Sequence, residues 1–172
     1  MNAARSPKPE GYEVERINVR LTRSFPKACA ALEELAPIAD VSAFAQMVSS
    51  GWDARRIERA IEGIVGELGF MILSKLEQGP LVSILGKPKK MSLYLLGNPV
   101  LANRMYDQRP AVGLYAPLRA LIYEDEQGTC FFTYERPSTL LEQFNNGEIR
   151  AVARMLDQRM DQLATRLGGT TA

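Results

Sequence analysis

The 172-residue chain contains no histidine. Histidine is the commonest general base and transition-metal ligand in proteins, so its absence removes Ser-His and Cys-His activation of a nucleophile. Only two cysteines occur, Cys29 and Cys130, and they lack the C-x-x-C spacing of zinc sites. We therefore expect two buried thiols, no metal site and no cofactor.

The sequence also lacks an excess of either charge and a long apolar run. Its 21 basic and 20 acidic residues give a formal charge of +1, so no overall field attracts nucleic acid or anionic lipid. No segment approaches the roughly 18 apolar residues of a membrane span, and residues 1–12 lack the apolar core of a signal peptide. These absences favour a soluble cytoplasmic protein that binds neither nucleic acid nor membrane.

The remaining composition is that of an ordinary globular domain. With 46% hydrophobic residues, the chain can bury a core without disulfides or metals, and its length is near that of one domain. Residues 1–11 are rich in proline, glycine and polar residues and predict a flexible tail. Residues 12–172 are then expected to form a single α/β domain.

Two hydrophobic periods alternate along this domain. Alternating or continuous apolar residues predict strands at 17–21, 91–97, 118–124 and 129–135, the last two joined as a hairpin. Helical spacing predicts helices that begin near residues 25, 41, 54, 99 and 137, and a final helix over about 148–167. The apolar segment 81–85 fits neither pattern. The mixture predicts an α+β fold: a two-layer sandwich with a mixed or antiparallel sheet, helices on one face and an extra C-terminal helix.

The junction Gly97-Asn98-Pro99 follows the apolar strand MSLYLLG directly. Glycine gives a turn its freedom, asparagine is a preferred helix cap and proline suits the first helical position. In one interpretation these residues only form the turn from strand to helix. In the other, the exposed N–H groups and the helix dipole bind a small anion. Arg104 lies too far along the helix to assist.

Two charged segments can likewise be interpreted either as solvated surface or as a binding site. Glu124, Asp125 and Glu126 occupy the predicted hairpin turn, where solvation explains them better than a metal site does. Three lysines surround Pro88, and a solvated loop is favoured there over contact with a phosphate group. These lysines are Lys87, Lys89 and Lys90.

Residues 53–144 resemble the family of uncharacterised bacterial proteins called domain of unknown function three hundred and two. The matching runs are LYLLGNPVLANRM and GLYAPLRALIYEDEQGTCFFTYERP. The shared pattern is a strand ending in Asn-Pro, a Leu-x-x-Pro-Leu segment (Leu114, Pro117, Leu118), an acidic hairpin turn and Tyr-x-x-Pro (Tyr134, Pro137). The resemblance implies an α/β sandwich, often a homodimer, without established activity. Many relatives carry cysteine where this chain has Gly97, so a nucleophilic thiol is excluded at this position.

Tyrosines near the junction extend the candidate ligand site. Their hydroxyls can face a cleft beside Asn98, or they can be core residues with one satisfied hydroxyl each. The predicted ligand-binding residues are Gly97, Asn98, Pro99, Tyr94, Tyr115 and Tyr134.

Two functions compete on this basis. The first is a non-catalytic binding or interaction module acting as a homodimer, with a small anionic ligand near Asn98. The alternative is a metal-independent enzyme acting on a small molecule, with an anion-binding cleft at the helix starting at Pro99. No catalytic residue can be assigned. An enzyme would require polar groups to meet in a cleft, and the groups available for it are Glu62, Glu67, Lys75 and Tyr134.

Overall fold

The computed structural model describes residues 11–170. Its strands are β1 (Arg16–Leu21), β2 (Met71–Leu76), β3 (Met91–Gly97), β4 (Leu118–Glu124), β5 (Cys130–Glu135) and β6 (Gly169–Thr170). Its helices are α1 (Phe25–Leu35), α2 (Val41–Ser49), α3 (Ala54–Ile64), α4 (Gln78–Leu85), α5 (Pro99–Tyr106), α6 (Pro137–Leu141) and α7 (Gly147–Arg166). Two short 3-10 helices are η1 (Pro110–Leu114) and η2 (Glu142–Phe144).

The strands form one six-stranded sheet in the order β2-β3-β4-β5-β1-β6. Every neighbouring pair is antiparallel, which confirms the predicted α+β class. The predicted hairpin is present as β4 and β5, which pair Tyr123 with Phe131. β1 joins the far side of β5, where Val19 pairs with Phe132.

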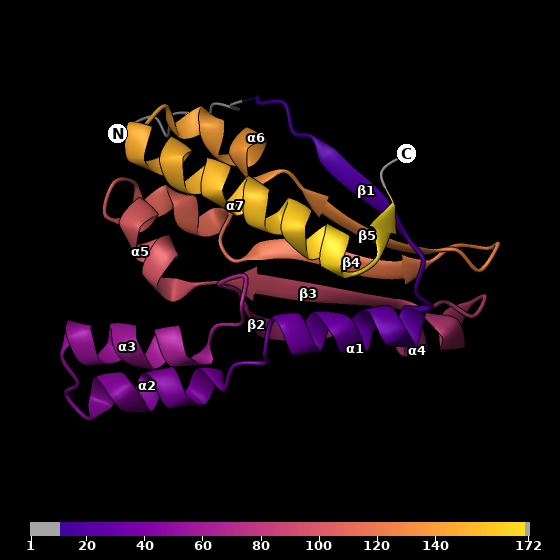
Figure 1. Ribbon diagram of the computed structural model, residues 1–172, viewed down its shortest axis with the longest axis horizontal. Coiled ribbons are helices and arrows are strands. Elements are labelled where there is room, and N and C mark those ends of the chain that lie inside the picture. The colour runs from indigo at the N-terminus through magenta and orange to yellow at the C-terminus, as the bar shows by residue number, and fades with distance from the viewer. Residues whose placement is uncertain (1–10, 171–172) are drawn as a thin grey trace, which may run out of the picture.

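Helices cover one face of the sheet, which we call the inner face. α7 and α1 both lie in front of the sheet in Figure 1, with part of β3 visible between them. Alternate strand residues point toward them, so Tyr94, Ile122 and Phe132 are fully buried against Leu32 of α1 and Ile149 of α7. This alternation follows from the period of two in a strand.

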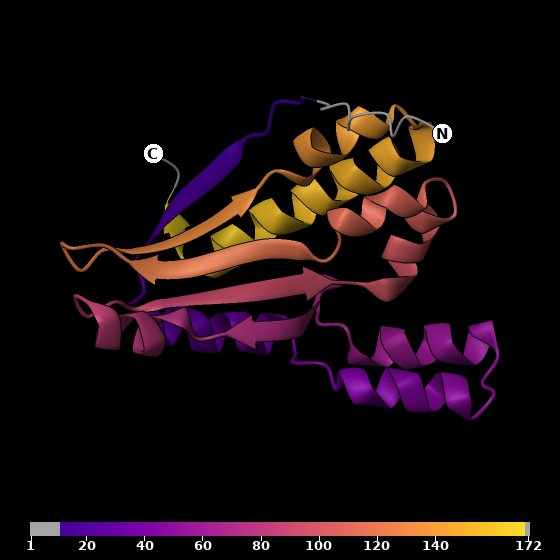
Figure 2. The same cartoon turned by 180° about the vertical axis from the view of Figure 1, so that it is seen from behind.

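The opposite face of the sheet, which we call the open face, carries the other set of strand residues. Leu93, Leu95 and Leu121 belong to it and are only half-buried. Seen from this side, β3, β4 and β5 are crossed by no helix of residues 11–170 (Figure 2).

A helical hairpin of α2 and α3 projects beyond the end of the sheet (Figure 1). Asp40 and Asp53 cap the two helices by accepting hydrogen bonds from the N–H groups of Ser42 and Arg56. The hairpin packs on a small separate core around Ile61, and α2 has no fully buried residue. It is therefore held by far less apolar contact than α7.

The structure shows local details that the sequence pattern left open. The uncertain segment 81–85 is helical and belongs to α4. Ser24 immediately precedes α1, but its side chain makes no capping hydrogen bond. Asn146 caps α7, which begins at Gly147. Cys29 and Cys130 are buried and unpaired as expected, and the predicted tail lies outside the described residues except for Gly11.

Candidate ligand-binding site

The Asn98 side chain makes three hydrogen bonds at the start of α5. Its Oδ1 accepts from the N–H groups of Val100 at 3.0 Å and Leu101 at 3.2 Å. Its Nδ2 donates to the Gly69 carbonyl at 3.0 Å. Pro99 has no N–H group, so the first turn of α5 offers no unoccupied N–H to an anion.

Gly97 lies close to two neighbouring side chains at this junction. A Cβ atom at this position would lie 2.9 Å from Cδ1 of Leu73 and 3.4 Å from Cβ of Pro117. The first distance is shorter than carbon atoms tolerate without movement. Leu73 and Pro117 therefore lie next to the space that a side chain at this position would take.

A cavity of about 240 Å³ lies beside the junction. We call it the junction cavity. It lies between α5, the end of β3, the segment before β4 and α7. Most of its wall is apolar and is made by Phe70, Leu73, Leu96, Leu101, Met105, Pro117, Leu118, Leu141 and Leu156. Polar side chains in the wall are Asn98, Asn103, Tyr106 and Tyr115.

The polar groups of the wall have protein partners of unequal strength. The Tyr115 hydroxyl accepts from Tyr12 at 3.0 Å and donates to Gln143 at 3.4 Å. The Tyr106 hydroxyl donates to the Ala116 carbonyl at 3.5 Å, which is long for a hydroxyl donor. Burial raises the pKa of Tyr106, so its hydroxyl remains neutral at physiological pH. Tyr106 therefore offers the most available polar group to a guest.

Two of the predicted tyrosines lie in the core, away from this cavity. The Tyr94 hydroxyl donates to Glu33 at 3.1 Å, and the Tyr134 hydroxyl donates to Asp161 at 2.6 Å. Burial raises the pKa of both phenols. Both match the core interpretation of one satisfied hydroxyl each. Of the six predicted residues, the structure brings together Gly97, Asn98, Pro99 and Tyr115.

Comparison with known families places the chain in one of them. A family model described as "Domain of unknown function DUF302" matches residues 46–167 of the 172. The chain belongs to the DUF302 family. The match extends beyond the predicted core of 53–144 and includes α7, whose Leu156 lines the junction cavity.

A solved structure supports the fold of this DUF302 domain. It is the crystal structure of an uncharacterized conserved DUF302 protein from Bacillus stearothermophilus, with a TM-score of 0.63 and 16% identity. The similarity covers 88% of this chain and 97% of that one. No curated protein matches the chain.

The groups that an enzyme would require lie apart in this DUF302 domain. Lys75 pairs with Glu33 at 3.0 Å and Glu77 at 2.8 Å, and Glu67 pairs with Arg166 at 3.1 Å. The hydrogen bond from Arg166 lowers the pKa of Glu67. Between residues 11 and 170, no three potential ligand side chains gather around a metal position. None of the helices described has the length and apolar character to cross a membrane.

Sequence reasoning missed several cavity residues. Ala102, Met105 and Tyr106 follow Asn98 at helical spacings of four, seven and eight, which place them on one face of α5. That spacing could have identified them. Phe70 and Leu156 enter from distant parts of the chain and leave no local signal.

Proposed function

We propose that this DUF302 domain is a non-catalytic binding module that takes a small, uncharged and largely apolar ligand in the junction cavity. The apolar wall beside Asn98 carries this proposal. An apolar cavity of about 150 Å³ admits benzene, so the junction cavity has room for a guest the size of indole. The anionic ligand expected from sequence is disfavoured, because Asn98 occupies the N–H groups of the first turn of α5.

Indole is a suitable probe, and the melting temperature of the domain is the readout. A ligand that binds only the folded state raises the melting temperature, and the stabilisation grows with the logarithm of one plus the ratio of its concentration to Kd. We expect a dose-dependent rise for the wild-type domain. Ala102→Phe fills the cavity and should abolish the rise, whereas Ala151→Phe at an exposed position of α7 should retain it. An equal response from wild type and Ala102→Phe would reject the cavity as the site.

The enzyme alternative has less support. Glu67, Lys75 and Tyr134 are committed to separate partners. A binding module requires no such convergence. The two buried thiols, Cys29 and Cys130, are unpaired, which suits a reducing compartment and supports a cytoplasmic location.

The proposed homodimer is supported by α4. This helix has no charged residue, and Leu81, Ile84 and Leu85 are 66%, 82% and 83% exposed. Leu76 at the end of the edge strand β2 adds to this surface at 46%. We call these four residues the α4 patch. Exposed apolar clusters of this kind mark protein interfaces, and a second copy would cover the patch by symmetry.

Light scattering coupled to size-exclusion chromatography tests the homodimer. We expect a dimer from the wild-type chain. Leu85→Lys should yield a folded monomer, because it places a charge in the apolar contact. Gln158→Lys adds the same charge at an exposed position of α7 and should remain dimeric. A wild-type chain that stays monomeric at high concentration would contradict the proposal.

A further inference from the structure

The open face of the sheet is apolar along β3 and polar along β1. Antiparallel sheets with one solvated face place polar residues on that side. Here β3 has leucine at 93 and 95 on the open face, and β4 adds Leu121 between them and β5. Within residues 11–170 no helix covers these side chains (Figure 2).

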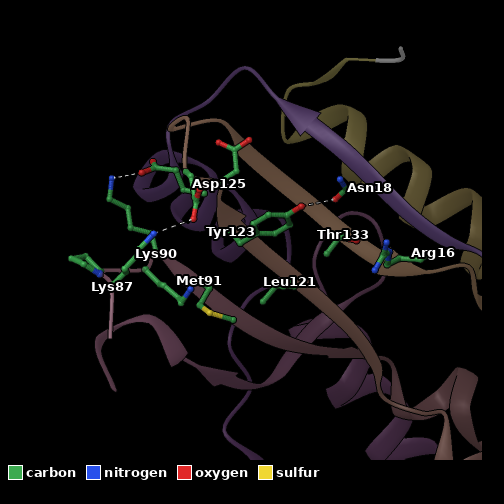
Figure 3. Close-up of a pocket in the computed structure, with 13 residues that line it drawn as sticks. Arg16, Asn18, Lys87, Lys90, Met91, Leu121, Tyr123, Asp125 and Thr133 are labelled. Carbon is green, nitrogen blue, oxygen red and sulfur yellow. Dashed lines mark hydrogen bonds and ion pairs between the residues drawn. The ribbon is translucent and has the colours of Figure 1, made fainter. Parts of the chain in front are cut away.

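A groove of about 720 Å³ lies on this face, near the β4–β5 turn. We call it the sheet groove. Its floor includes Met91, Leu121 and Tyr123 (Figure 3). The Tyr123 ring stacks on Phe131 with centroids 5.3 Å apart, and its hydroxyl donates to Asn18 at 3.3 Å. The floor is therefore held in place, and the volume is within the usual range of ligand pockets, about 300–1,000 Å³.

Carboxylates of the groove already have partners. Glu124 accepts from Lys90 at 2.6 Å, and Glu126 lies 3.8 Å from Lys87. The Asp125 carboxylate accepts two backbone N–H groups of the turn, those of Gln127 and Thr129. None of these acidic groups neutralises the remaining basic side chains of the groove.

Two cations of the groove are left for a guest. Arg16 on β1 and Lys89 in the loop before β3 line it, and neither forms an ion pair with any residue between 11 and 170. In Figure 3 Arg16 and the loop containing Lys87 and Lys90 lie at opposite ends of the groove. The apolar floor lies between these ends.

The sheet register gives the distance between the two ends. β1 and β3 are separated by β5 and β4, which amounts to three strand spacings, or about 14 Å. Arg16 pairs with Glu135, whereas Phe131 at the other end of β5 pairs with Tyr123. That offset of four residues adds about 14 Å along the strands, so Arg16 and Met91, which pairs with Tyr123, lie roughly 20 Å apart on the diagonal, and Lys89 lies two residues farther along.

We propose that the sheet groove binds an elongated organic dianion, such as a long-chain dicarboxylate. One acidic group pairs with Arg16, the other pairs with Lys89, and the apolar chain covers Met91 and Leu121. The ligand must therefore be elongated, with its two acidic groups at opposite ends of the groove. This site is separate from the junction cavity and does not depend on it.

Calorimetric titration of the full chain with dodecanedioate tests the proposal. We expect saturable one-to-one binding, and at least about tenfold weaker binding of dodecanoate, which has one acidic group. Arg16→Gln and Lys89→Gln should each weaken dodecanedioate binding to about the level of dodecanoate. Arg154→Gln removes an exposed cation of α7 and should bind as wild type does.

These measurements distinguish binding of dodecanedioate at the sheet groove from its nonspecific attraction to positive charge on the protein. Arg16 and Lys89 are both exposed, so we expect their glutamine variants to fold. Unchanged melting temperatures will show that they do. Equal affinities in wild type, Arg16→Gln and Lys89→Gln would overturn the proposal, as would the absence of binding heat. Ala102→Phe should bind dodecanedioate normally, so this result does not depend on whether the junction cavity binds a ligand.

Discussion

Asn98 connects a local cap to the tertiary structure. Its Oδ1 satisfies two N–H groups of α5, and its Nδ2 reaches the Gly69 carbonyl. Gly69 has a φ of +72°, a left-handed conformation that favours glycine. It lies in the turn that leads into β2. The same side chain thus stabilises a helix start and fixes the turn next to it.

Substitution of Asn98 by alanine should therefore cost more than an ordinary cap. Loss of the cap costs about 1 kcal/mol, and loss of the hydrogen bond to Gly69 adds about 1 kcal/mol. We expect the free energy of unfolding in urea to fall by about 2 kcal/mol for Asn98→Ala. Asn98→Asp keeps the acceptor but loses the donor, so its effect should be intermediate. A change below about 0.5 kcal/mol for Asn98→Ala would contradict this account.

Residue-level prediction succeeded where the cause was local. The cap role of Asn98 follows from its position between a strand and Pro99, and the structure shows it. The tyrosines behaved differently. Tyr94 on β3 and Tyr134 on β5 are on the covered face of the sheet, but alternation alone shows only that residues share a face. Which face the helices cover depends on α1 and α7, which contact the sheet from far along the chain.

At the scale of elements, the α2–α3 hairpin is the part held by the fewest interactions. α2 buries no residue completely, and Val41 and Val48 are 51% and 69% exposed. Local opening is easiest where few apolar contacts must be broken. The hairpin should therefore open without unfolding of the sheet.

Hydrogen–deuterium exchange measures this difference directly. We expect the amides of α2 to exchange much faster than those of α7, whose Val152, Met160 and Leu163 are fully buried. The amides of β3 and β4, in the middle of the sheet, serve as the internal standard for slow exchange. Equal protection of α2 and α7 would show that the hairpin is part of the global folding unit.

Elements with strong local patterns could be predicted, and those defined by distant contacts could not. The hairpin of β4 and β5 and the helix after Asn98 follow from alternation and capping. α4 was ambiguous because residues 81–85 are a short apolar run without a period. In the structure, a Cβ at Gly79 of α4 would lie 2.5 Å from the Lys89 carbonyl. That close approach is visible only in the folded chain, as is the pairing of β1 with β5.

At the scale of the whole molecule, the buried ionisable groups predict how stability varies with pH. The chain has no histidine, the only side chain that ordinarily titrates between about pH 5 and 8. At higher pH, burial raises the pKa of the Cys130 thiol from an ordinary value of 9.0 to about 11. Burial also raises the pKa values of Cys29, Tyr94 and Tyr134.

The sign of the effect follows from proton linkage. The unfolded chain releases the Cys130 proton near pH 9, whereas the folded chain holds it to about pH 11. The unfolded state therefore binds fewer protons in this window, and the free energy of unfolding falls as pH rises. The stabilisation is complete below pH 9.0 and is lost as pH rises through about 11. The buried tyrosines extend the loss above their ordinary pKa of 10.0.

Urea unfolding at a series of pH values tests this prediction. We expect a constant midpoint from about pH 6.5 to 8.5 and a steady fall from about 9 to 11. Cys130→Ala should start less stable because it leaves a small cavity. Its midpoint should nevertheless fall less steeply over the same range, since one buried thiol no longer titrates. Identical slopes for wild type and Cys130→Ala would show that the tyrosines and Cys29 carry the alkaline loss. A wild-type midpoint that stayed constant to pH 11 would contradict the burial of all four groups.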